Sequence, residues 1–142
     1  MSAPSDDKPL RVLIVDDDEA HADALSDALE ADGYAPTVAT SGEEGIARVS
    51  ETTFDAVLTD LVMPDRSGIE VLEAAVRAQP DVAVLLVTGH ESVRTAVDAM
   101  RKGASDYLSK PVDISELRAR LEALERRVQQ AVPAEHVPML GH

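Results

Sequence analysis

The sequence predicts an α/β domain in which one open parallel sheet is covered by helices on both faces. Five short apolar segments alternate with five segments whose apolar residues recur at helical spacing. Strands and helices of these lengths pair in parallel through right-handed crossovers. Of the 142 residues, 44% are hydrophobic, but only one is Phe and none is Trp, so the chain can bury one mainly aliphatic core.

The first two strands and the helix between them follow from the opening part of the chain. Leu10–Val15 is a continuous apolar run, typical of a strand that is buried on both faces. Glu19–Asp32 carries apolar residues at helical spacing, and Gly33 follows it as a helix stop. Ala35–Ala39 has the length of a second strand.

The middle of the chain predicts two helices with a third strand between them. Ser41 and Glu44 have the spacing of a capping box and begin a helix that runs to about Ser50. Ala56–Thr59 is the third strand. After a loop that contains a proline, a helix is expected at Gly68–Ala78, and a further proline ends it.

The last third of the chain predicts two strands and two helices. Val82–Val87 is the fourth strand, and helical spacing returns at Val93–Met100, which Gly103 closes. Asp106–Ser109 is a short fifth strand. A final helix is expected from Asp113 to about residue 131. Its apolar stripe fits either an amphipathic helix that faces the core or a coiled-coil contact with a second copy.

Polar side chains suited to phosphoryl chemistry follow four of the five predicted strands. They are Asp16, Asp17 and Asp18 after the first strand, Asp60 after the third, Thr88 after the fourth and Lys110 after the fifth. Because the carboxyl ends of parallel strands open onto one crevice, we expect these groups at the same edge of the sheet. Crowded carboxylates repel one another, and a hard cation such as Mg²⁺ relieves that repulsion.

Asp60 is the best candidate for a nucleophile, because a carboxylate can accept a phosphoryl group and form an aspartyl phosphate. Lys110 would place an ammonium on one phosphoryl oxygen, and Thr88 would donate a hydrogen bond to another. The simpler interpretation is that the acids at 16–18 only cap the first helix and that Thr88 and Lys110 are ordinary surface residues. Their joint placement at one edge favours the site.

Four motifs, in this order, carry a resemblance to a known family. They are Val15-Asp16-Asp17-Asp18, then Asp60-Leu61-Val62-Met63-Pro64-Asp65 with Gly68, then Val87-Thr88-Gly89, and finally Ala104-Ser105-Asp106-Tyr107-Leu108-Ser109-Lys110-Pro111. Over about residues 9–130 the chain resembles the receiver domain of two-component response regulators. Residues 1–8 are then expected to be a disordered N-terminal segment. Residues 131–142 are expected to be a linker or tail, or the start of a truncated output domain.

The resemblance implies a flavodoxin-like (CheY-like) fold, with five parallel strands in the order 2-1-3-4-5 and five helices on both faces. It implies phosphotransfer from a histidine kinase to Asp60, which makes the chain a phosphorylation-activated switch. It also implies that Mg²⁺ is the cofactor. The metal ligands would be Asp17 and Asp60 directly, Asp16 through water, and the backbone carbonyl of Val62.

The other residues that the resemblance implies are the switch pair Thr88 and Tyr107, the cis peptide bond between Lys110 and Pro111, and Val62 and His90, which would tune hydrolysis. On switching, the threonine hydroxyl would move toward the phosphoryl group and the tyrosine ring would turn inward. Only an X-Pro bond adopts the cis form at small cost. Asp18 is an acid beyond the usual pair, and the sequence assigns it no role.

Within this family, the stretch from Thr88 to Asp113 is similar to receivers of nitrogen-regulation-type activators, which work with the alternative sigma factor. Residues 138–142 are similar to the entry of the ATPase domain that follows such receivers. We therefore expect the chain to be the truncated receiver of a regulator with a transcriptional output domain. The alternative is a stand-alone receiver that acts through protein contacts. The expected partners are a sensor histidine kinase and, after phosphorylation, a second copy. The copies would meet through the fourth helix, fifth strand and last helix, or through the last helix.

Two other kinds of protein use similar residues. A haloacid-dehalogenase-type phosphatase would use Asp16 and Asp18 as nucleophile and acid. However, Ala20 stands where that family has Thr or Val, no later acidic pair follows, and Asp60 has no role in it. A flavin-binding module would need a donor-rich phosphate loop after the first strand, where acids stand here. Steady turnover of a phosphate monoester would favour the phosphatase, and a coloured protein would favour the flavin module.

Composition argues against several further classes. A formal net charge of −14 disfavours direct binding to nucleic acid or to an anionic membrane. No apolar run approaches membrane-spanning length, the acidic N-terminus is not a signal peptide, and there is no cysteine. We expect a cytoplasmic regulatory domain that is not an enzyme and that assists only its own phosphorylation and dephosphorylation.

Overall fold

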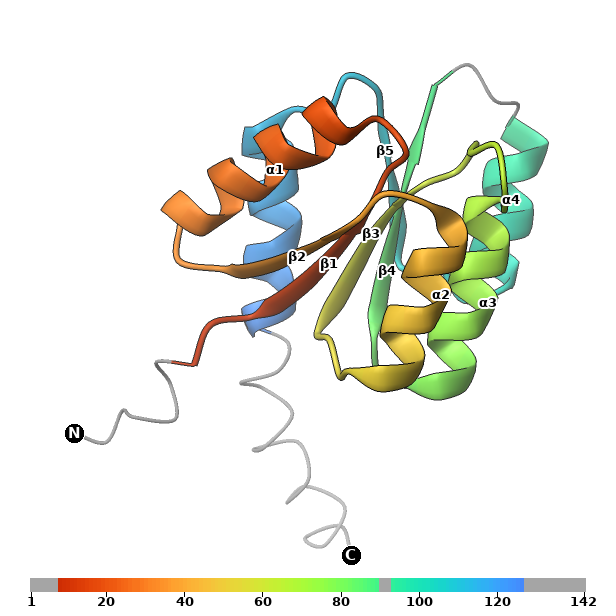
Figure 1. The fold of residues 1–142 in the computed structure, drawn as a ribbon, viewed down its shortest axis with the longest axis horizontal. Helices are drawn as coiled ribbons and strands as arrows, with labels where there is room; N and C mark the ends of the chain where they lie inside the picture. Colours follow the sequence, from red (N-terminus) through yellow and green to blue (C-terminus); the bar gives the residue numbers. More distant parts are fainter. Residues whose placement is uncertain (1–7, 90–92, 127–142) are drawn as a thin grey trace, which may run out of the picture. The chain divides into compact units, whose positions relative to one another are not determined.

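The computed structural model describes residues 8–89 and 93–126 (Figure 1). The chain divides into two compact units, Met1–Val112 and Asp113–His142. In chain order, the first unit contains β1 (Arg11–Val15), α1 (Glu19–Ala31), β2 (Ala35–Ala39), α2 (Gly42–Glu51), β3 (Ala56–Asp60), α3 (Gly68–Ala78), β4 (Ala83–Thr88), α4 (Val93–Arg101) and β5 (Asp106–Ser109). In the second unit, a helix occupies residues 114–126. No helix within these described ranges has the length and apolarity that crossing a bilayer requires.

The strands form one parallel sheet in the order β2-β1-β3-β4-β5. Together with the five helices of the described residues, this order confirms the predicted fold class. The register pairs Val15 with Thr59 and Asp60 with Val87, and β5 runs beside β4 to Ser109. Strands β1, β3, β4 and β5 therefore end at one edge of the sheet, where the polar residues were expected.

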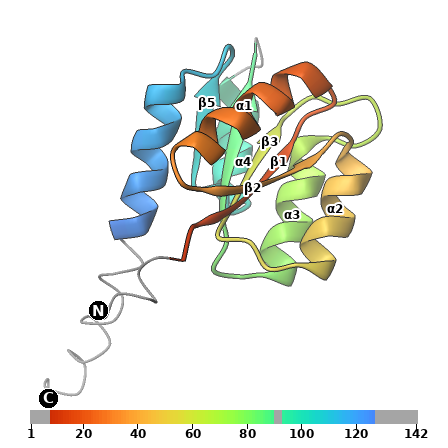
Figure 2. The ribbon, with the colours of Figure 1, turned by 60° about the vertical axis from the view of Figure 1, so that its left-hand side comes forward.

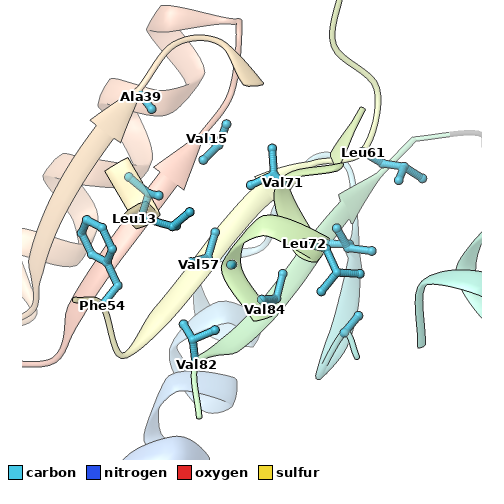
Figure 3. Packing of buried hydrophobic residues seen from close by; sticks show 14 of the residues in the cluster. Leu13, Val15, Ala39, Phe54, Val57, Leu61, Val71, Leu72, Val82 and Val84 are labelled. Carbon is cyan, nitrogen blue, oxygen red and sulfur yellow. The ribbon is translucent and has the colours of Figure 1, made fainter. Parts of the chain in front are cut away.

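Successive strand residues point to opposite faces of the sheet, and both faces carry helices. Leu13 and Val15 of β1 and Leu72 of α3 belong to one buried cluster (Figure 3). The cluster also contains Val49 of α2 and Ala99 of α4. Figures 1 and 2 show these three helices on one side of the sheet and α1 on the other. Burial on both sides explains why the strands are continuous apolar runs.

Two strand boundaries differ from the prediction at the functional edge. Asp60 is the last residue of β3 and Thr88 is the last residue of β4, whereas the apolar runs stop one residue earlier. The ladder continues through both residues because parallel pairing uses backbone groups and does not depend on side-chain polarity. Strand geometry therefore holds the backbone of both residues.

Helix ends follow most of the predicted signals. Gly33 and Gly103, the two expected helix stops, have positive φ values of 94° and 112°. The Ser41 hydroxyl accepts a hydrogen bond from the Glu44 backbone N–H, as an N-cap does. The predicted capping box is only half formed, because the Glu44 carboxylate accepts from the backbone N–H of Thr40.

Candidate functional site

Four of the predicted side chains meet at the carboxyl edge of the sheet. Asp16, Asp17 and Asp60 each offer a carboxylate oxygen within 4.8 Å of the other two. The Lys110 ammonium donates a hydrogen bond of 2.7 Å to Asp60 Oδ2. The acids come from the ends of β1 and β3 and the lysine follows β5, so the strand order brings together residues that are far apart in the sequence.

The acidic cluster combines two buried carboxylates with one that is exposed to water. Asp16 is 3% exposed and Asp60 is 5% exposed, whereas Asp17 is an exposed residue. A buried carboxylate is costly unless it is paired or hydrogen-bonded. The exposed third carboxylate leaves the cluster accessible to an incoming ion.

The electrostatics of the cluster favour positive charge. Burial raises the pKa of Asp60 and the charge of Asp16 raises it further, and the opposing hydrogen bond and charge of Lys110 do not cancel this rise. Burial alone would lower the pKa of Lys110. The hydrogen bond to Asp60 and the negative charges of Asp60, Asp16 and Asp17 outweigh it, so the pKa of the ammonium lies above its ordinary value. Lys110 therefore stays charged, and the cluster retains an excess of negative charge.

This donor set fits Mg²⁺. The ion binds hard oxygen ligands, typically uses one or two protein carboxylates, and keeps positions for water and phosphate oxygens. Two buried acids and one exposed acid at short range supply such oxygens. Positive charge held there would replace the mutual repulsion of the carboxylates with attraction.

Asp18 caps the first helix, and His21 makes a contact that the sequence did not predict. Asp18 caps α1, since its carboxylate accepts a hydrogen bond from the His21 backbone N–H. The simpler interpretation of the acidic triplet thus holds for this one residue. The His21 ring lies against Asp16, with Nδ1 at 2.5 Å from Oδ2. The sequence places His21 in the first turn of the predicted helix, close to the acidic triplet, but it does not specify the direction of the ring.

The loop after β3 packs closely on Asp60. The backbone N–H of Gly68 donates to the carbonyl of Leu61 at 2.8 Å, and a Cβ at position 68 would lie 2.4 Å from the carbonyl oxygen of Asp60. Further along this loop, the Asp65 carboxylate accepts two hydrogen bonds from the first turn of α2. The donors are the backbone N–H groups of Gly42, at 3.1 Å, and Glu43, at 2.9 Å. These bonds tie the loop to α2.

The remaining predicted residues lie around this cluster. Thr88 is half-buried at the end of β4, and its carbonyl accepts a hydrogen bond of 2.8 Å from the Lys110 backbone N–H. The Tyr107 side chain is 46% exposed and that of Val62 is 60% exposed. The bond between Lys110 and Pro111 is cis, as the resemblance implies. His90 lies outside the described residues.

A hollow of about 330 Å³ lies beside the cluster. It is lined by Asp18, His21, Lys110 and Pro111. Because Lys110 both lines the hollow and contacts Asp60, the phosphoacceptor candidate lies next to a space that an approaching group can enter.

Comparison with known proteins gives a consistent family. The family model of the response regulator receiver domain matches residues 12–122. Transcriptional regulatory protein ZraR of Escherichia coli is 41% identical over 111 residues, which cover 78% of this chain and 25% of ZraR. Response regulator MprA of Mycolicibacterium vanbaalenii is 38% identical over 119 residues, which cover 84% of this chain and 52% of MprA. The chain therefore spans about a quarter to a half of the length of these relatives.

Solved structures agree with the sequence relatives. A CheY-like response regulator receiver domain protein from Methanospirillum hungatei has a TM-score of 0.81 and 34% identity, covering 86% of this chain and 98% of that chain. A response regulator from Burkholderia pseudomallei, determined with a phosphorylated aspartic acid, calcium ion and citrate, has a TM-score of 0.75 and 32% identity, covering 89% of this chain and 74% of that one. None of these matches supports the phosphatase alternative. This chain belongs to the response regulator receiver domain family.

Proposed function

We propose that this chain is a phosphorylation-activated switch in which Asp60 accepts a phosphoryl group from a histidine kinase in a Mg²⁺-dependent reaction. The observation that carries the proposal is the position of Asp60. It is buried at the edge of the sheet, held by Lys110, with two further carboxylates close enough to share a cation. A phosphoryl acceptor needs this combination of a nucleophilic carboxylate and positive charge.

The reaction needs little from the protein beyond positioning. A carboxylate oxygen of Asp60 attacks the phosphorus, the bond from phosphorus to the imidazole nitrogen of the donor breaks, and its electron pair leaves with that nitrogen. Lys110 offsets the charge of the phosphoryl oxygens. A bound Mg²⁺, held by Asp17, Asp60 and the Val62 carbonyl, with Asp16 acting through water, would add positive charge. The chain thereby assists its own phosphorylation and dephosphorylation and has no other catalytic role.

Switching would use the two residues next to the phosphoryl group. The Thr88 hydroxyl would donate to a phosphoryl oxygen, and the Tyr107 ring, which is 46% exposed here, would turn inward. The phosphoryl group shifts the equilibrium only by its different interactions with the two states. Val62 and His90 would set how long the phosphoryl group survives, because the family resemblance implies that residues at these two positions flank its entrance.

The relatives support the output side of the proposal. ZraR is a transcriptional regulatory protein and MprA is a response regulator, so transcriptional control by a longer regulator is the favoured output. The Burkholderia pseudomallei structure holds both a phosphorylated aspartic acid and a divalent cation, which supports both features at this site. The proposed setting is the cytoplasm, with residues 9–130 as the receiver and residues 131–142 as linker. A stand-alone receiver that acts through protein contacts is the second candidate.

The proposal is tested by incubating the purified chain with acetyl phosphate and Mg²⁺ and measuring intact mass. One phosphoryl group per chain is expected, located by peptide mapping to the peptide that contains Asp60. Its appearance should require Mg²⁺. Steady release of phosphate from a generic phosphate monoester, without a stable single modification, would contradict the proposal and support a phosphatase.

Mg²⁺ is expected to stabilise the folded chain through Asp17. An ion that binds only the folded state adds about 2.7 kcal/mol to the free energy of unfolding when its concentration is 100 times the dissociation constant. Asp17→Ala should lose most of this gain, because Asp17, the exposed acid of the cluster, would bind the ion directly. Thermal unfolding with and without Mg²⁺ measures the gain. An equal gain in Asp17→Ala and wild type would refute this ligand.

Phosphorylation is expected to promote pairing of two copies through the α4–β5 face, defined here as Val97, Met100 and Tyr107. These are large hydrophobic side chains that are 42–46% exposed. Val97 and its neighbours Arg94, Asp98 and Arg101 line a hollow of about 500 Å³ on α4. Charges of both signs beside apolar residues suit a self-complementary contact. A second route, through the helix at 114–126, remains an alternative proposal.

Met100→Lys is expected to prevent phosphorylation-dependent pairing without changing the extent of phosphorylation. The substitution places a charge on the α4–β5 face, at a residue that is not part of the acidic cluster. Light scattering after treatment with acetyl phosphate measures the mass in solution. Ala47→Lys, an exposed position on α2, adds the same charge elsewhere and should pair like wild type. Unchanged pairing in Met100→Lys would exclude this face.

A further inference from the structure

His21 engages one of the two oxygens of Asp16. His21 Nδ1 lies 2.5 Å from Asp16 Oδ2, and the backbone N–H of Asp18 donates to Asp16 Oδ1 at 2.9 Å. A carboxylate oxygen only accepts hydrogen bonds, so Nδ1 carries the proton and donates it. Both oxygens of a buried carboxylate are thus held from the same turn.

The backbone of His21 is held by the start of α1. His21 lies in the first turn of α1, and its backbone N–H donates to the carboxylate of Asp18, the N-cap residue. The His21 side chain is 27% exposed, whereas that of Asp16 is 4% exposed. The imidazole therefore lies between solvent and a buried acid, on a residue whose backbone is held by the N-cap of α1.

Asp16 needs this donor because other carboxylates crowd it. The hydrogen bond of Lys110 goes to Asp60, and the ammonium acts on Asp16 through its charge. The nearest acids are Asp17 and Asp60, which repel the carboxylate of Asp16. Without the imidazole, Asp16 would keep one backbone hydrogen bond and would be free to turn away from the cluster. A buried carboxylate that loses a donor also bears the cost of an unsatisfied oxygen.

We propose that His21 is a positioning residue that orients Asp16 for Mg²⁺ binding. This inference rests on the proposed function, in which Asp16 contacts the ion through water. Outer-shell donors to metal-binding groups typically contribute 10- to 100-fold to metal affinity. Because Asp16 would act through water, we expect the lower end, about tenfold. His21 contacts neither the ion nor the phosphoryl group in this role.

The test is the Mg²⁺ dissociation constant of the whole chain, measured by titration calorimetry at one fixed pH. His21→Leu removes the donor and should weaken binding about tenfold. His21→Asn should restore most of the affinity, because its amide nitrogen occupies the place of Nδ1. Ala24→Leu, at an exposed position on the same helix, should bind like wild type. Unchanged or tighter binding in His21→Leu would overturn the proposal.

A double-mutant comparison separates positioning from a general effect on the fold. In an Asp16→Ala background, His21→Leu should have no further effect on Mg²⁺ affinity, because there is no carboxylate left to orient. A second tenfold loss would show that His21 acts by another route and would overturn the proposal. If leucine at position 21 prevents folding, His21→Gln replaces it, because its amide lies one bond too far to match Nδ1. Failure of the proposed function would appear differently, as a wild-type chain that does not bind Mg²⁺.

Discussion

Replacing Asp60 with asparagine is expected to abolish phosphorylation and, in the absence of metal, to stabilise the folded chain at neutral pH. Loss of phosphorylation follows because an amide is not a nucleophile toward phosphorus. Stabilisation follows because the pKa of Asp60 is raised, first by burial and then by the charge of Asp16, despite the contact with Lys110. A carboxyl group with a raised pKa makes the folded state less favourable once it ionises.

The pH dependence gives the sign of this effect. The unfolded chain loses the Asp60 proton near the ordinary value of 3.8, and the folded chain loses it at a higher pH. The contribution of Asp60 to stability therefore declines as pH rises from below 3.8 through the folded value, and the decline is complete above it. The advantage of Asp60→Asn should be present at pH 7 and disappear in acid.

Urea unfolding of the metal-free protein at several pH values, together with intact mass after acetyl phosphate, measures both effects. Asp81→Asn is the matched control, because it removes one charge from an exposed position outside the acidic cluster. It should be phosphorylated like wild type. Full phosphorylation of Asp60→Asn would contradict the assignment of the acceptor, and lower stability at pH 7 would contradict the electrostatic account.

Gly68→Ala is expected to lower the free energy of unfolding by about 3 kcal/mol and to slow phosphorylation of the remaining folded protein. The new Cβ would lie 2.4 Å from the carbonyl oxygen of Asp60 and 2.8 Å from the Cα of Leu61. Both are backbone atoms of the segment that carries the phosphoacceptor, so relieving the clash must move that segment. Alanine's higher helix propensity, about 1 kcal/mol, offsets only part of the cost.

Gly45→Ala is the comparison that isolates this effect. Gly45 lies within α2, and its Cβ would meet the Val15 side chain at 2.8 Å rather than backbone atoms. A side chain can shift at lower cost than a paired strand, so this variant should lose less stability and should be phosphorylated at the wild-type rate. Chemical denaturation and phosphorylation kinetics measure the two properties. Equal losses in both variants would show that contact with the Asp60 backbone is unimportant.

Much of the site could be predicted because it depends on strand ends. Apolar runs locate the strands, and parallel topology places whatever follows them at one edge. Asp16, Asp17, Asp60 and Lys110 are found together for this reason. The exact boundaries were harder to predict, since Asp60 itself continues its strand and backbone pairing does not depend on side-chain polarity.

Contacts that depend on side-chain direction could not be predicted. The ring of His21 meets Asp16 only because of the way α1 begins. The sequence predicted no contact for Asp65, yet its carboxylate accepts hydrogen bonds from the backbone at the start of α2. Gln79 likewise joins segments distant in sequence, accepting from the Phe54 backbone N–H and donating to backbone carbonyls at the end of α2. Nothing in local sequence patterns specifies such pairings.

The most direct test of the proposed site is a crystal structure of the chain grown with Mg²⁺ and beryllium fluoride, which imitates a phosphoryl group on a carboxylate. We predict one ion bound by Asp17, Asp60 and the carbonyl of Val62. The beryllium fluoride should be bonded to the Asp60 carboxylate, with its fluorine atoms in contact with the Thr88 hydroxyl and the Lys110 ammonium. An ion bound elsewhere, or an Asp60 carboxylate without the adduct while another acid carries it, would contradict the proposal that these residues form one phosphoryl-accepting centre.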